Sequence, residues 1–167
     1  MPMLIRWRDG AAVGAEDPFT SIADDEPMRP GDVLISWSRF QLEGPALLGE
    51  VRNLGVKLSA ADDASDLTTV LGRLSLVALD FPKFRDGRAY SAARLLRERL
   101  GWTGELRAVG DVLVEQALFM VRCGFDTFEP ADGAGPDDWT RAAGRFANVY
   151  QRAADGREPA FAFRGGA

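Results

Sequence analysis

The sequence predicts a single α/β domain over residues 1–167, with a parallel sheet of about five strands and alternating helices. From Gly31 onward, short apolar runs alternate with longer amphipathic segments, which is typical of strands joined by right-handed helical crossovers. Several runs alternate between polar and apolar residues, so we expect helices on only one face of the sheet. We therefore favour a half-barrel, similar to part of a TIM barrel, over a flavodoxin-like sheet with helices on both faces.

Residues 1–30 are expected to form an N-terminal extension. Residues 3–13, centred on Asp9-Gly10, have the turn signal of a short hairpin, and residues 14–30 are rich in acids and prolines, as in an extended loop. The predicted strands that follow are 33–37, 55–58, 75–81, 105–109 and 125–129. The predicted helices are 38–48, 65–74, 90–100, 112–123 and 137–154.

The composition excludes several kinds of chemistry. The chain has no histidine, which excludes a histidine general base, a Ser-His-Asp triad and histidine metal ligands. Its one cysteine, Cys123, excludes an intrachain disulfide, a dithiol redox pair and a four-cysteine metal site, so no metal is expected. Any redox chemistry therefore needs a bound organic cofactor or a partner.

Charge and hydropathy limit the location and the partners. A net charge of −5 argues against nucleic-acid binding. No segment reaches the ~20 apolar residues that span a membrane, and the polar start MPMLIRWRDG does not resemble a signal peptide. We expect a cytoplasmic protein that binds neither nucleic acid nor membrane.

A charged loop follows the predicted strand 75–81, at the edge of the sheet where parallel α/β folds place their sites. Its cations could bind an anion such as a phosphate or a sulfur oxyanion. The alternative is a turn at Asp86-Gly87 with solvated charges. The candidate ligand-binding residues here are Asp80, Lys83, Arg85, Asp86 and Arg88.

Arg107 and Asp111 extend this candidate anion site. Arg107 lies in a short strand, where a buried charge needs a partner. It precedes the turn Gly110-Asp111, whose free N–H groups at the start of a helix would suit an anion. Asp111 is also a good helix N-cap, and Arg107 could instead form a structural salt bridge with Asp80 or Asp126.

Arg94 and Arg97 flank the apolar stripe of the predicted helix 90–100, where a solvated or partner-facing surface is the favoured interpretation. The predicted helix 112–123 is apolar almost all round, so we expect a cover on more than one side. That cover is either the predicted last helix, with Trp139, Ala143, Phe146 and Tyr150 on one stripe, or a second subunit in a homodimer.

Residues 81–129 contain a series of closely spaced motifs: Phe81-Pro82-x-Phe84, Asp86-Gly87-Arg88-x-Tyr90-Ser91, Arg94-Leu95-Leu96-Arg97, Gly104-Glu105-Leu106-Arg107-Ala108, Gly110-Asp111-Val112 and Cys123-Gly124-Phe125-Asp126. With these motifs the segment resembles a bacterial family of unknown function that is encoded beside assimilatory sulfite reductase and regarded as a probable oxidoreductase of that pathway. One position departs from the family pattern, which usually has a second glycine where this chain has Ala89.

Three functions remain open. The resemblance implies an accessory protein of assimilatory sulfite reduction, with sulfite reductase as its partner and an anionic ligand at the strand ends. The second is a small oxidoreductase with bound flavin or NAD(P)H, although the chain has no glycine-rich dinucleotide loop. The third is a non-catalytic protein-interaction module, with its arginine-rich surface against a partner.

Overall fold

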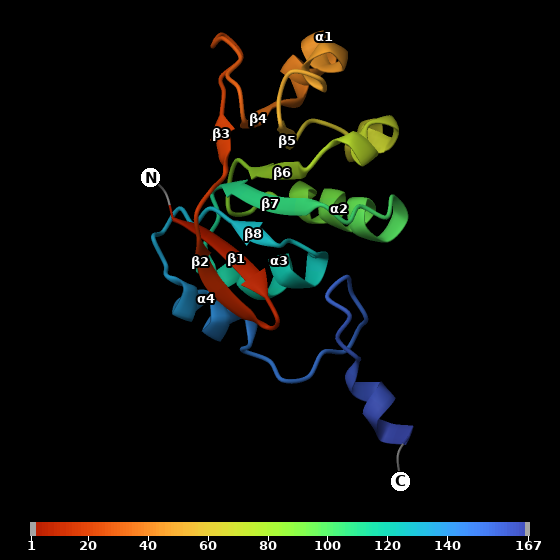
Figure 1. Cartoon of the computed structure of the whole chain (residues 1–167). Helices are drawn as coiled ribbons and strands as arrows, with labels where there is room; N and C mark the ends of the chain where they lie inside the picture. Colours follow the sequence, from red (N-terminus) through yellow and green to blue (C-terminus); the bar gives the residue numbers. More distant parts are fainter. Residues whose placement is uncertain (1–2, 166–167) are drawn as a thin grey trace.

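The computed structural model describes residues 3–165, which form a curled sheet with helices on one face (Figure 1). The eight strands within this range lie in the order β2-β1-β8-β7-β6-β5-β4-β3. Strands β3 to β8 run parallel, and β1 pairs antiparallel with both β2 and β8. The strands are β1 Leu4–Arg8, β2 Ala11–Ala15, β3 Phe19–Ser21, β4 Asp32–Ser36, β5 Asn53–Leu58, β6 Leu76–Phe81, β7 Glu105–Gly110 and β8 Thr127–Phe128.

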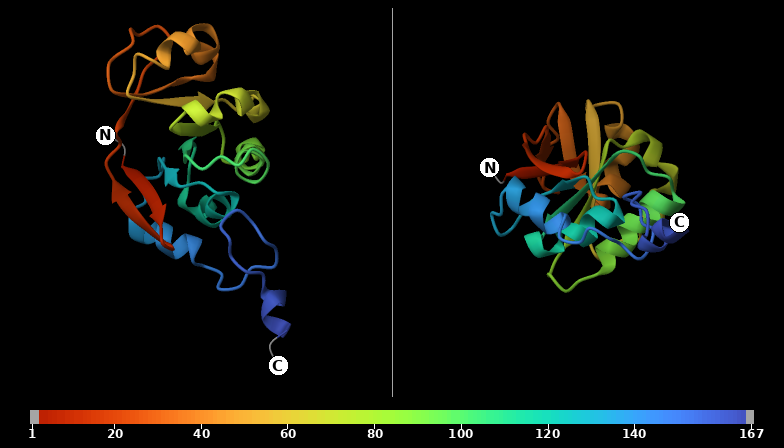
Figure 2. Two further views of the ribbon diagram at one scale, coloured as in Figure 1. Left: turned by 45° about the vertical axis from the view of Figure 1, so that its right-hand side comes forward. Right: turned by 90° about the horizontal axis from the view of Figure 1, so that it is seen from below.

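Helices and helical turns connect the strands on the outer side of the curled sheet (Figure 2). After α4 the chain leaves the sheet as a segment of residues 144–165, here called the C-terminal arm, at the opposite end of the molecule from α1 (Figure 1). The helical elements are α1 Trp37–Leu47, η1 Ala64–Thr69, η2 Leu71–Arg73, α2 Arg88–Arg94, η3 Leu95–Arg99, η4 Val114–Gln116, α3 Ala117–Cys123, α4 Pro136–Ala143 and η5 Ala160–Gly165.

The two faces of the sheet differ as the half-barrel prediction requires. On the helix side, Leu106 and Ala108 of β7 belong to the main apolar core. On the other side, Arg107 lies close to a small separate cluster of Leu34, Leu76, Ala78 and Val109, which Phe19 of β3 covers. Because successive side chains of a strand point to opposite faces, the alternation in 105–109 was sufficient to predict these two environments. The α/β half-barrel is therefore confirmed.

The expectation of about five parallel strands is wrong, because the N-terminal extension adds three more. Residues 14–30, expected to be a loop, contain β3, which pairs with β4 from Phe19 opposite Asp32 onward. The predicted hairpin is present as β1 and β2, and it joins the sheet beside the very short β8. Backbone pairing with β1 gives β8 a second neighbour and makes the sheet mixed.

Three predicted helices also differ from the structure. The last one ends at Ala143 rather than 154, because Gly144 follows directly and glycine commonly ends helices. The prediction 65–74 forms two short 3₁₀ turns. The prediction 112–123 becomes helical only from Val114, after an extended Leu113. No helix among residues 3–165 is long and apolar enough to cross a membrane.

Candidate functional site

In the loop between β6 and α2, Asp86 and the Arg88 that follows it form a local ion pair. The Asp86 carboxylate accepts hydrogen bonds from the Arg88 backbone N–H at 3.1 Å and from the Arg88 guanidinium at 2.5–3.2 Å. These bonds, above all those from the guanidinium, lower the pKa of Asp86 to about 2. Arg88, the first residue of α2, is therefore ion-paired with Asp86 and is not a free anion ligand.

The turn Gly110-Asp111 is closed by the same loop. The Asp111 N–H donates to the Phe81 carbonyl at 2.7 Å, and the Asp111 carboxylate accepts from the Phe84 N–H at 2.7 Å. Gly110 has a φ of +93°, and a Cβ there would lie 2.5 Å from the Phe81 oxygen. Since the helix starts only at Val114, the expected helix N-terminus with free N–H groups at Asp111 is absent from this turn.

Lys83 and Arg85 remain as the exposed cations of the loop. Among the residues that the structure describes, neither takes part in a salt bridge within the chain. Asp80, near the end of β6, lines a cavity of only about 30 Å³ together with Ser59 and Asp62. The loop thus offers two free cations, and the carboxylates nearby do not favour an anion.

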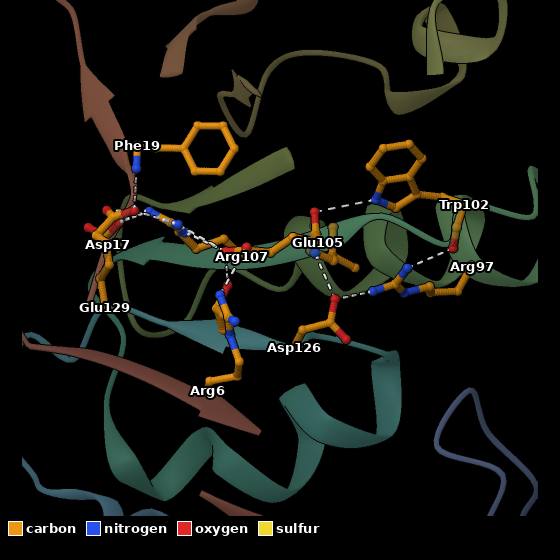
Figure 3. A network of polar contacts seen from close by, with 11 residues as sticks. Arg6, Asp17, Phe19, Arg97, Trp102, Glu105, Arg107, Asp126 and Glu129 are labelled. Atoms are coloured by element: carbon orange, nitrogen blue, oxygen red, sulfur yellow. Dashed lines mark hydrogen bonds and ion pairs between the residues drawn. The ribbon is translucent and has the colours of Figure 1, made fainter. Parts of the chain in front are cut away.

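Arg107 is fully buried on the inner face of the sheet and is surrounded by acids (Figure 3). Its guanidinium donates to Asp17 at 2.6 and 2.9 Å, to Glu105 at 2.9 and 3.1 Å and to Glu129 at 3.2 Å. The centroid of the Phe19 ring lies 5.7 Å from the guanidinium carbon of Arg107.

This network corrects the expected roles of Arg107. Its partners are Asp17, Glu105 and Glu129, instead of the expected Asp80 or Asp126. Burial acts to lower the pKa of Arg107, but the hydrogen bonds that Arg107 donates to Asp17 and the charge of Glu105 raise it, so the guanidinium stays charged. Three carboxylates around one cation repel an incoming anion, so Arg107 is not an anion site. Its bonds to Asp17 instead hold the segment before β3 against the sheet.

Arg97 and Arg94 point to different surroundings. The Arg97 guanidinium donates to the carbonyls of Trp102 and Gly104 at 2.7 and 2.9 Å and to the Asp126 carboxylate at 2.6 Å (Figure 3). Its side chain is only 14% exposed, which corrects the expectation that it faces a partner. Arg94 is 55% exposed and forms an ion pair with Glu98 on the surface. Of the two, Arg94 alone is available to a partner.

An apolar hollow lies between α3 and the C-terminal arm, and we call it the arm groove. It has a volume of about 530 Å³. Three of its aromatic side chains are well exposed: Phe119 at 65%, Phe146 at 57% and Tyr150 at 83%. The lining residues are Arg94, Leu118, Phe119, Arg122, Cys123, Phe146, Asn148, Val149, Tyr150, Gln151, Arg152 and Ala153.

The arm is attached to α3 by polar contacts beside the groove. The Arg122 guanidinium pairs with Asp155 at 3.4 Å and also donates to the Gln151 carbonyl, while the Ala154 N–H donates to the Arg122 carbonyl at 3.1 Å. Cys123 is half-buried beside these residues, and burial raises the pKa of its thiol. The groove is therefore built by two segments of the chain that are held together.

The sequence interpretation missed this groove. Phe146 and Tyr150 were assigned to a stripe of the predicted helix 137–154, but that helix ends before them and leaves both exposed. Gly144 was the available signal, since a glycine between Ala143 and Phe146 interrupts the stripe. Phe119 gave no signal, because its helix is apolar almost all round.

The fold and the site define a class: an α/β half-barrel with an aromatic, arginine-lined groove between a helix and its C-terminal arm. In the described residues, no group of three or more acidic or cysteine side chains is placed to hold a metal ion. Residues 55–161 match the family described as "Bacterial protein of unknown function (DUF934)", and the chain belongs to this family. No curated protein and no solved structure matches the chain.

Proposed function

We propose that the protein is a non-catalytic accessory protein of assimilatory sulfite reduction that binds a partner protein through the arm groove. The observation that carries this proposal is the gathering of Phe119, Phe146 and Tyr150 at the surface around one hollow. Contiguous exposed apolar surface on a protein marks an interaction site, and aromatic residues with arginine are the types enriched at protein interfaces.

The alternative site at the strand ends is less well supported. Arg88 and Arg107 are neutralised by their own carboxylates, and the N–H of Asp111 is used within the chain. An anion there would depend on Lys83 and Arg85 alone. A loop with two exposed cations binds an anion weakly, because water screens both charges.

The pathway part of the proposal comes from the resemblance of residues 81–129 to proteins encoded beside sulfite reductase. The segment that matches the family, 55–161, includes every residue that lines the arm groove. Sulfite reductase is therefore the partner that we propose first. An oxidoreductase with bound flavin or NAD(P)H is the competing proposal, and it too rests on the resemblance.

A deletion strain tests the pathway role. We expect it to grow poorly with sulfate as the only sulfur source and normally with cysteine, and we expect the wild-type gene to restore growth. Growth on sulfate at the parental rate would refute the pathway role. In parallel, absorbance at 450 nm of the purified protein and its oxidation of NADPH separate the two proposals, because a retained flavin or turnover would favour the oxidoreductase.

A further inference from the structure

We propose that the arm groove takes an acidic segment of the partner that inserts bulky apolar side chains as anchors. This inference rests on the proposed function, because it names the chemistry of the partner at the same groove. It depends on three properties of the groove: where the aromatic residues lie, which charges line it and how it would face a second copy of itself.

The apolar part of the groove provides the anchor site. Five aromatic residues are exposed in the described chain, at positions 84, 119, 146, 150 and 161, and three of them line this hollow. Leu118 and Val149 extend the apolar lining. A volume of about 530 Å³ lies in the range of small-ligand pockets, so it accepts a few side chains of a segment and not a whole domain face.

The charges around the groove select an acidic occupant. Its charged lining residues are Arg94, Arg122 and Arg152, and no carboxylate lines it, although the chain as a whole has a net charge of −5. Guanidinium groups bind carboxylates in paired hydrogen bonds and also stack on aromatic rings. A segment with Asp or Glu beside its anchors therefore fits this lining.

Two of these arginines can exchange their partners. Arg94 pairs with Glu98 and Arg152 pairs with Glu158, each at 3.2 Å. Both acids are exposed, at 38% and 53%, whereas the Asp86 side chain that pairs with Arg88 is only 16% exposed. Exposed ion pairs contribute little stability, so a partner's carboxylate can replace Glu98 or Glu158 at small cost. Arg122 differs, because its ion pair with the nearly buried Asp155 holds the arm.

A second copy of this chain is a poor occupant. In a two-fold dimer the same patch meets itself, so two linings whose charged residues are all arginines would be brought together. Like charges in contact across an interface are unfavourable and suppress the wrong partner. The groove therefore fits a different protein better than it fits a homodimer.

Panning a phage-displayed library of random peptides of about 12 residues against the purified protein tests this inference, because the library has no bias toward acidic sequences. We expect the enriched peptides to combine Asp or Glu with Trp, Phe or Leu. In fluorescence anisotropy, the best labelled peptide should bind Phe119→Ser and Arg94→Glu about tenfold more weakly than the wild type. Leu42→Ser, which changes an 86% exposed residue on the distant helix α1, should bind like the wild type.

Three results would overturn the inference: no enrichment above that obtained with Phe119→Ser, enriched peptides without acidic residues, or a sedimenting dimer that Phe119→Ser dissociates. Circular dichroism of each variant confirms that it is folded.

The outcome of the peptide experiment can be separated from the test of the pathway role. If the gene that carries Phe119→Ser restores growth of the deletion strain as well as the wild-type gene does, the pathway role stands and the groove inference falls. If acidic peptides bind but the deletion strain grows normally, the groove inference stands and the pathway role falls.

Discussion

Replacing Arg107 with methionine should lower the free energy of unfolding more than replacing any surface arginine. Arg107 is fully buried and donates five hydrogen bonds to three carboxylates, whose side chains are 17–29% exposed. Removing one member of a buried ion pair costs about 3 to 5 kcal/mol, because the remaining charges lose their partner. The partial exposure of these acids favours the lower value, about 3 kcal/mol. At 2–4 °C per kcal/mol for a chain of this size, the melting temperature should fall by roughly 6 to 12 °C.

Urea unfolding followed by tryptophan fluorescence measures this loss directly. Arg141→Met is the matched control, because Arg141 is 76% exposed and pairs only with the exposed Asp138; we expect it to cost less than about 0.5 kcal/mol. Asp17→Asn should cost less than Arg107→Met, since Glu105 and Glu129 remain. A cost below about 1 kcal/mol for Arg107→Met would refute the reasoning, because it would mean that Arg107 does not hold the segment before β3 in place.

Two further predictions concern the loop at the strand ends. Gly110→Ala should cost about 2 to 4 kcal/mol in urea unfolding, because its φ of +93° and the Phe81 oxygen exclude a Cβ, whereas Gly87→Ala should be near neutral. Equal losses of unfolding free energy for Gly110→Ala and Gly87→Ala would contradict the close approach of Gly110 to the Phe81 oxygen. The Asp86 carboxyl should titrate at about 2 by ¹³C NMR and return toward its ordinary 3.8 in Arg88→Ala. Since this pKa is lowered on folding, the stabilisation is present above about pH 4 and is lost as the pH falls toward 2; an unchanged pKa in Arg88→Ala would contradict the pairing.

The sequence was informative where structure depends on local pattern. The alternation of Glu105, Leu106, Arg107 and Ala108 placed each side chain on its observed face, because the period of a strand is fixed by backbone geometry. That pattern was enough to predict the half-barrel. The hairpin at Asp9-Gly10 was also predicted, because this residue pair favours a tight turn in which both residues have positive φ. Both residues do adopt positive φ in the structure.

Features that depend on distant segments were not predictable. Arg107 and its partner Asp17 lie 90 positions apart, and nothing local to either residue indicates the pair. Strand β3 has only three residues in an acidic, proline-rich stretch, so its pairing with β4 gives no periodic signal. The arm groove exists only because the chain turns back after Gly144 and bonds to Arg122, which places two separate segments side by side.

The binding of sulfite reductase at the arm groove, which we propose, is tested most directly with a mixture of the purified protein and purified assimilatory sulfite reductase from the same bacterium. Sedimentation velocity measures whether the two proteins move together. We predict a complex with the wild type and with Leu42→Ser, and its loss with Phe119→Ser. If the wild type and Phe119→Ser behave alike, because both bind the reductase or because neither does, the proposed binding at the arm groove is contradicted.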